Sequence, residues 1–253
     1  MMGAVLAAEW IKVNTVRVHR VIVAVAVCFP LVVGILVAVF TPDPRFVTGA
    51  DVVDLVTGTS VVSLLLLACL WAINLTAEYA HGTIRVTYAA VPVRWTVIAA
   101  KAVVGSVVTA VVMAVTFWAA WWASSTIVGS RGSSASLGQV DDVAATVIGL
   151  IMLAVIVSWF ALGLGLLIRN SPATVVVTLL WPLLIENLVV LALTLSGVDD
   201  PQRWMPYQSA INAVVDDASG PASLGRPWSH MYFAAVALVL VVVGTVLETR
   251  RDA

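Results

Sequence analysis

The chain has 253 residues, of which 61% are hydrophobic and only 11% are charged, and its mean hydropathy is +1.05. This composition predicts an all-α protein that crosses a membrane several times and leaves little chain for a soluble domain. The formal net charge is −1, and we expect no nucleic acid partner. The only two cysteines, Cys28 and Cys69, lie inside apolar runs, which favours packing roles and excludes a disulfide framework or a thiolate metal site.

The first 20 residues predict a helix that lies along the inner leaflet. Leu6, Trp10 and Val13 recur at i, i+4 and i+7, while charged residues fall on a different side. Those charged residues are Glu9, Lys12 and Arg20. The charges within this stretch, and the absence of a small-residue cleavage site after the apolar run that follows, argue against a cleavable signal peptide.

Six apolar runs are long enough to cross a bilayer, which takes roughly 20 residues. They are Val21 to Phe40, Leu55 to Leu75, Ala102 to Ala123, Val143 to Ile168, Ala173 to Ser196, and His230 to Leu247. An even number of crossings places both termini on one side of the membrane. That side carries most of the cations, namely Lys12, Arg17, Arg20, Arg85, Arg94, Lys101, Arg169, Arg250 and Arg251. The other side carries only Arg45, Arg131, Arg203 and Arg226, so the distribution predicts that both termini are cytoplasmic.

The stretch between the second and third spans, residues 76–101, is the longest connection that we predict to be cytoplasmic. A helix that starts near Thr76 would place Glu78, Gly82 and Arg85 on one face. Ile84, Tyr88 and Val91 would then form an apolar face on another side. We expect Pro92 to end this helix, because proline lacks the backbone N–H and disfavours helical geometry in the residue before it. The alternative is a loop that rests on lipid headgroups.

The outer segment 197–229 is long for a connection and mixes apolar and polar residues. Ile211, Val214 and Val215 predict a short helix that dips back into the membrane as a re-entrant or lid segment. An exposed loop with a few apolar residues is the alternative.

One ionisable residue falls deep inside a predicted span, and that residue is Glu186. A charge in the hydrocarbon core costs at least a few kcal/mol unless it is paired, hydrated or neutralised, so Glu186 is a candidate for the substrate route or gate. Asn187 follows it, and Pro182 precedes it by about one turn and favours a kink. Trp159 and Trp181 also lie inside spans, where the indole N–H needs a partner. The alternative hypothesis for Glu186 is a structural role, as a protonated glutamic acid that hydrogen-bonds across a helix or subunit interface.

Catalytic motifs are missing from the sequence. There is no GxSxG elbow, no HExxH zinc motif and no GxxxxGK[ST] loop for nucleotide phosphates. The three histidines, His19, His81 and His230, are scattered. We therefore expect no metal and no enzymatic activity in this chain.

Three stretches together resemble the ABC-2 type permease family, the membrane subunits of bacterial ATP-driven exporters, and particularly its actinobacterial branch. They are Glu9-Trp10-Ile11-Lys12 with Arg17; the run from Glu78 to Arg85 with Pro92-Val93-Arg94 and Ala100-Lys101; and Ile168 to Ser171 leading to Trp181 to Glu186. Their order and spacing carry the resemblance, which covers essentially the whole chain as a single transmembrane domain, residues 1–253.

The resemblance implies a place in the bacterial cytoplasmic membrane, a second permease copy or homologue, and separate ABC ATPase subunits. Those subunits would bind ATP and Mg²⁺, and this chain would carry no cofactor. The interfacial helix, with Glu9, Trp10, Lys12 and Arg17, and the loop 76–101 would rest on the ATPase. Docking would involve Glu78, Tyr79, His81, Gly82 and Arg85, whereas Trp181, Pro182, Glu186 and Asn187 would lie at or near the substrate route. The cargo would be a small amphipathic molecule such as a drug or antibiotic.

Two other functions remain open from the residues alone. The first is a stand-alone carrier driven by an ion gradient, with Glu186 as the ion site, although no convincing internal repeat is present. The second is a membrane anchor or assembly protein without cargo.

Overall fold

The computed structural model describes residues 2–91, 93–140, 142–215 and 223–250, and this part of the chain is helical without any strand. It contains six helical segments that are long and apolar enough to cross a membrane, as predicted, so the chain is a multi-pass membrane protein. These are α2 (Arg17–Phe40), α3 (Gly49–Ala80), α5 (Arg94–Ser130), α6 (Val143–Ile168), the segment Ser171–Leu195, and α10 (Arg226–Arg250). The residues outside the described ranges include Pro92, Asp141, Asp216, Asp217 and Arg251.

Shorter helices connect and flank these segments. They are α1 (Met2–Thr15), α4 (Thr83–Ala90), α9 (Pro206–Val215) and the 3₁₀ turns η1 (Pro44–Phe46), η2 (Leu137–Gln139) and η4 (Pro201–Trp204). The segment Ser171–Leu195 is itself divided into α7 (Ser171–Leu180), a π-helical turn η3 (Trp181–Ile185) and α8 (Glu186–Leu195). A short helix, α9, lies between the fifth and sixth spans, where the sequence predicts one.

The helix ends follow local signals in the sequence. Thr48 caps α3 by accepting a hydrogen bond from the backbone of Asp51, whose carboxylate accepts one from the Thr48 backbone in return. Asn170 caps α7 through the backbone N–H of Ala173, with a proline in the first turn. These caps fix the residues at which α3 and α7 begin.

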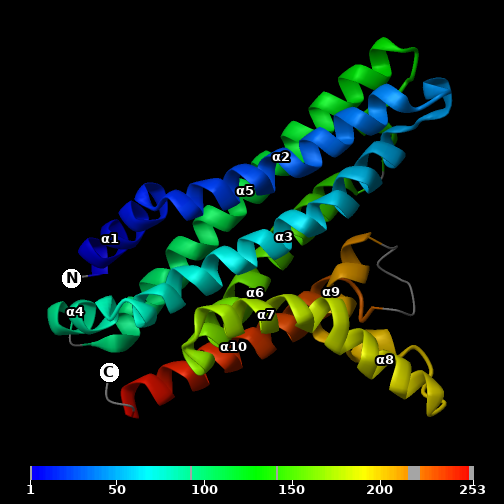
Figure 1. The fold of residues 1–253 in the computed structure, drawn as a ribbon. Helices are drawn as coiled ribbons and strands as arrows, with labels where there is room; N and C mark the ends of the chain where they lie inside the picture. Colours follow the sequence, from blue (N-terminus) through cyan, green and yellow to red (C-terminus); the bar gives the residue numbers. More distant parts are fainter. Residues whose placement is uncertain (1, 92, 141, 216–222, 251–253) are drawn as a thin grey trace.

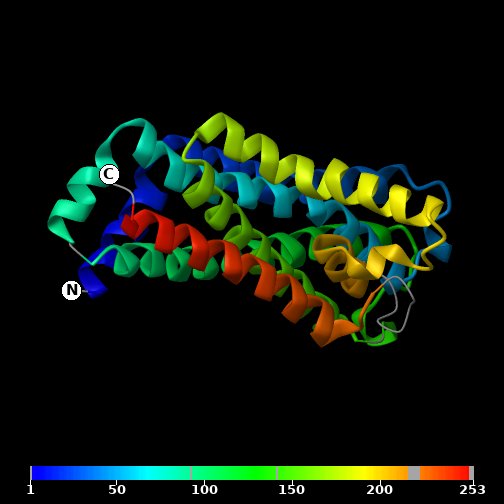
Figure 2. The same ribbon diagram turned by 90° about the horizontal axis from the view of Figure 1, so that it is seen from below.

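Both chain termini lie at the same end of the bundle as α4 and the turn between α6 and α7 (Figure 1). We call this the terminal end, and we call the opposite end, which holds η1 and η2, the loop end. Seen from below, α4 projects at the terminal end, whereas α8 and α9 lie toward the loop end (Figure 2). Each long helix therefore connects the two ends of the molecule.

Helix α6 is the central element. Within its most apolar 18 residues, 67% are buried, compared with 17% in the corresponding stretch of Ser171–Leu195. It packs closely on α10, because a Cβ at Gly163 would lie 2.7 Å from Leu240 and one at Gly244 would lie 2.5 Å from Leu166. The absence of side chains at these two glycines lets the helix backbones approach, as in other membrane helix pairs.

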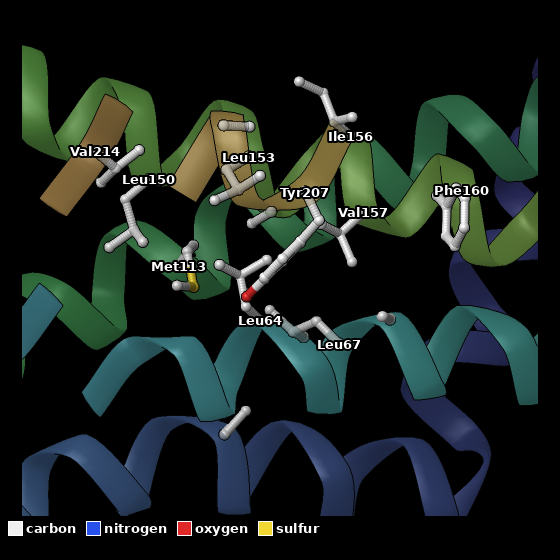
Figure 3. Packing of buried hydrophobic residues seen from close by; sticks show 14 of the residues in the cluster. Leu64, Leu67, Met113, Leu150, Leu153, Ile156, Val157, Phe160, Tyr207 and Val214 are labelled. Carbon is white, nitrogen blue, oxygen red and sulfur yellow. The ribbon is translucent and has the colours of Figure 1, made fainter. Parts of the chain in front are cut away.

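The main apolar core joins α3, α5, α6 and α9 (Figure 3). Leu64 and Leu67 of α3 face Met113 of α5 and a row of α6 side chains. Tyr207 of α9 inserts its ring into this core. Helix α9 is thus packed into the bundle, although it is too short to span a membrane.

The predicted continuous helix from near Thr76 across Gly82 is wrong. Helix α3 continues to Ala80, a turn follows, and α4 begins only at Thr83. Gly82 has φ +67°, a left-handed conformation that interrupts a right-handed helix and that glycine adopts without steric cost. The predicted apolar face is confirmed for Ile84 and Tyr88, which are both buried.

Helix α1 lies within the predicted range of residues 1–20 but ends at Thr15, because α2 begins at Arg17; its predicted apolar face is right for Val13 and wrong for Trp10. Glu9 is 1% exposed and lies on the inward face with Val5 and Val13, whereas Trp10 is 51% exposed. The inward face includes Glu9 because Lys101 of α5 and Lys12 of α1 itself neutralise this carboxylate, as described below. Cys69 is buried as expected, but Cys28 is exposed on α2 and has no packing role there.

Candidate functional site

Glu186 follows an irregularity in the fifth membrane segment. Pro182 cannot donate a backbone hydrogen bond, and the chain forms the π-helical turn η3 at this point. The backbone N–H of Glu186 bonds to the carbonyl of Trp181, five residues earlier. Such single π turns rotate the following residues relative to the rest of a helix, and here the turn directs Glu186 toward α9.

The Glu186 carboxylate accepts three hydrogen bonds and is 1% exposed. Its oxygens lie 2.9 Å from the backbone nitrogen of Tyr207 and 2.8 Å from that of Gln208. The indole nitrogen of Trp181 donates the third bond at 2.8 Å. The first N–H groups of a helix have no partner within the helix, so Glu186 caps the N-terminus of α9 from a different segment of the chain.

Asn187 extends this contact with its amide. Its oxygen accepts a hydrogen bond from Gln208 at 3.1 Å, and its nitrogen donates to the carbonyls of Pro182 and Leu183. We call Trp181, Glu186, Asn187, Tyr207 and Gln208 the Glu186 joint.

The structure brings the predicted residues Trp181, Pro182, Glu186 and Asn187 together. Sequence reasoning missed Tyr207 and Gln208, although Pro206, a residue favoured in the first turn of a helix, was a signal for a helix start there. In the conformation described, both oxygens of the Glu186 carboxylate accept hydrogen bonds from protein groups.

A second buried polar group lies at the terminal end, where we define the four-charge network as Glu9, Lys12, Glu78 and Lys101. The Lys101 ammonium lies 2.7 Å from Glu9 and 2.6 Å from Glu78. Lys12 lies 2.7 Å from Glu9 and 2.9 Å from Glu78. Two cations thus neutralise two carboxylates, and the pairs join α1, α3 and α5.

The position of each lysine differs. The Lys101 side chain is 0% exposed, whereas that of Lys12 is 35% exposed. Burial alone would lower the pKa of Lys12, but hydrogen bonds to Glu78 and Glu9 outweigh burial and hold the pKa above its ordinary value of 10.5. Lys12 is therefore held as a cation next to the two carboxylates.

Glu248, near the end of α10, centres another cluster at the terminal end. Its carboxylate pairs with Arg169 and accepts a hydrogen bond from the Tyr79 hydroxyl at 2.8 Å. Arg94 donates to the backbone carbonyl of Glu248, and its guanidinium lies 5.2 Å from the centre of the Tyr88 ring. This Glu248 cluster connects α3, α4, α5, α6 and α10.

The predicted docking residues separate into two groups. His81, Gly82 and Arg85 are exposed at the terminal end. Glu78 is buried in the four-charge network, and Tyr79 is bonded to Glu248, so both point into the protein. A groove of about 560 Å³ runs beside this surface, between α1 and α4, and Val5, Ala8, Val86 and Ala90 are among its lining residues.

Two further residues from the sequence analysis, Trp159 and Arg17, lie outside these sites. The indole N–H of Trp159 donates to the Ser106 hydroxyl at 2.9 Å, so it has a partner, as expected. Arg17 is exposed at the start of α2.

The described ranges contain no group of three His, Cys, Asp or Glu side chains that could hold a metal ion. No protein-family model matches the sequence, and a search of curated proteins finds no relative.

Proposed function

We propose that this chain is the membrane subunit of an ATP-driven exporter in a bacterial cytoplasmic membrane, working with a second permease and separate ATPase subunits. The observation that carries the proposal is the construction of α4. Arg85 of α4, and His81 in the turn before it, are exposed, while Ile84 and Tyr88 fix α4 to the bundle. The excess of cations at the terminal end supports a cytoplasmic position for α4.

Force applied to α4 has a rigid path into the membrane segments. Ile84 and Tyr88 pack with Val97 and Ala100 near the start of α5, a helix of 37 residues in all. The four-charge network binds α5 to the end of α3, which is 32 residues long. A tilt of α4 would therefore move α3 and α5 as rigid bodies, which is the usual form of a two-state coupling.

The Glu186 joint would transmit this motion at the loop end. Tyr207 of α9 packs in the same core as α3 and α5, and Glu186 ties α9 to the fifth membrane segment. We propose that α9 is the lid of the outer mouth and that it moves with α8. In this proposal Glu186 positions the lid, and it does not bind cargo in the described conformation.

The proposal expects an ATP-binding-cassette gene beside the gene for this chain, and co-expression of the two proteins tests it. We expect the ATPase to co-purify with the wild-type chain, and Arg85→Glu to reduce both its recovery and its stimulated ATP hydrolysis. Arg45→Glu is the matched control, because Arg45 is also exposed but lies at the loop end.

Unchanged recovery and unchanged stimulation with Arg85→Glu would refute docking at α4. Transport of a dye or antibiotic that continues without any ATPase, but stops when an uncoupler collapses the proton gradient, would instead identify an ion-driven carrier.

A further inference from the structure

A groove on the membrane-facing side of the bundle shares no residue with the three polar sites described above. It has a volume of about 340 Å³ and lies between α5 and the junction of α1 and α2. This volume is within the roughly 300–1,000 Å³ found for small-molecule sites. Its position on α5 is several turns beyond Lys101, toward the loop end.

The groove has one polar end and one apolar end. Trp10, Asn14 and Arg20 line the polar end, and Val23, Val107 and Val111 are among the side chains of the apolar wall. Trp10, Val107 and Val111 are each more than half exposed, so the groove opens outward from the bundle. Since the surrounding segments are membrane spans, the groove opens toward lipid.

Arg20 marks the depth of the polar end. It is the last charged residue before Val21 to Phe40, a run of 20 residues without any charge. Arginine at such a boundary lies at the level of the lipid headgroups, and tryptophan is enriched there for the same reason. The valine wall then extends from this level toward the membrane interior, where an acyl chain lies.

The positive charge of the groove favours a ligand with a negative charge. Arg20 is the only charged residue among its lining residues. Its guanidinium makes no hydrogen bond or ion pair with the part of the chain that the structure describes. Guanidinium matches phosphate geometry with two parallel hydrogen bonds, and the Asn14 side chain lines the same end of the groove.

We propose that this groove binds one anionic phospholipid, with the phosphate at Arg20 and an acyl chain along Val23, Val107 and Val111. Basic pockets between membrane helices on the cytoplasmic side bind anionic headgroups by this chemistry. The lipid would fill the space between α1 and the membrane part and would hold the α1–α2 junction against α5. The proposal rests on the membrane location and is independent of coupling to an ATPase.

The test measures lipids that stay bound to the full-length protein. The protein is reconstituted in nanodiscs with equal amounts of phosphatidylglycerol and phosphatidylcholine that carry the same acyl chains, and native mass spectrometry then counts the retained lipids. We expect the wild type to retain phosphatidylglycerol in preference to phosphatidylcholine. Arg20→Gln should reduce this preference about tenfold, the factor that corresponds to loss of a charge-assisted hydrogen bond.

Matched variants separate a site from general attraction of anionic lipid. Arg17→Gln removes a neighbouring exposed cation that does not line the groove, and we expect it to preserve the preference. Val111→Trp should fill the apolar wall and reduce retention of both lipids, whereas Val103→Trp, on an exposed part of α5 outside the groove, should not. Size-exclusion profiles and helical circular dichroism check that each variant is folded.

Two results would overturn the proposal. One is a wild-type protein with no preference for phosphatidylglycerol. The other is an equal loss of preference with Arg17→Gln and Arg20→Gln, which would show that the lipid belongs to the general layer around the protein.

Discussion

The four-charge network and the Glu186 joint solve the same physical problem in different ways. Each buries carboxylates inside a membrane protein, where an unpaired charge is costly. The network neutralises Glu9 and Glu78 with two ammonium groups, whereas the joint surrounds Glu186 with three N–H donors and no cation. The first arrangement fixes three helices by charge, and the second holds one short helix by its N-terminus.

This difference suggests a division of roles between the two ends. Ion pairs at the terminal end connect α1, α3 and α5 into a unit that would receive force. Hydrogen bonds at the loop end attach α9, an element of ten residues. The variants below disturb one end at a time and are ordered by expected effect.

The largest effect is expected for Lys101→Met. This change leaves two buried carboxylates with only the half-exposed Lys12, and breaking one side of a buried ion pair typically costs about 3–5 kcal/mol. Thermal unfolding in detergent should show the loss. Glu78→Gln combined with Lys101→Met should recover part of it, and an equally small effect of Lys101→Met and Lys12→Met would contradict the central place of Lys101.

Glu186→Ala should destabilise α9 and leave the terminal end unchanged. The substitution leaves two backbone N–H groups and one indole N–H without an acceptor. We therefore expect the free energy of local opening of α9 to fall by roughly 2–3 kcal/mol. Hydrogen exchange at Tyr207 and Gln208 measures this opening. Faster exchange at α4 as well would mean that the joint is not local.

Trp181→Phe and Tyr79→Phe form a matched pair of smaller changes. Each removes one donor to a buried carboxylate, Glu186 in the first case and Glu248 in the second, while other donors remain. We expect each to cost about 1–2 kcal/mol. Thermal unfolding and hydrogen exchange should assign the first loss to α9 and the second to the terminal end, and loss at the opposite end would contradict the assignment.

The smallest effect is expected from alkaline pH at the terminal end. The pKa of Lys12 lies above its ordinary value of 10.5, and burial raises the pKa of Tyr88 above its ordinary value of 10.0. A raised pKa contributes stability that is fully present below the ordinary value and is lost as pH rises toward the folded value. The melting temperature should therefore fall above about pH 10, and Lys12→Met should reduce that fall; an identical slope would contradict the role of Lys12.

Sequence reasoning was most successful where the signal was long and apolar. The six spans and the short helix α9 could be predicted because hydrophobic length and turn residues determine them. The same reasoning singled out Glu186 and Asn187, with Trp181 and Pro182 shortly before them, because polar residues inside apolar runs are conspicuous.

It failed where distant residues neutralise each other. Glu9 and Glu78 looked like residues of an exposed polar face, because helical periodicity does not show that Lys101, 23 residues after Glu78, lies beside both of them. Gly82 was treated as a helical residue, although its left-handed conformation depends on how α3 and α4 pack. The partners of Glu186 in α9 lie 21 and 22 residues away and leave no local pattern.

Cross-linking from α4 to an ATPase tests the central claim most directly. In a chain with Cys28 and Cys69 replaced by alanine, Val86→Cys introduces a thiol on the outward side of α4, where Val86 is 71% exposed, and Phe46→Cys introduces one at the loop end, where Phe46 is 80% exposed. A thiol-to-amine cross-linker should join position 86, and not position 46, to the ATPase in the purified complex. Absence of a product from position 86, or equal products from both positions, would contradict the account.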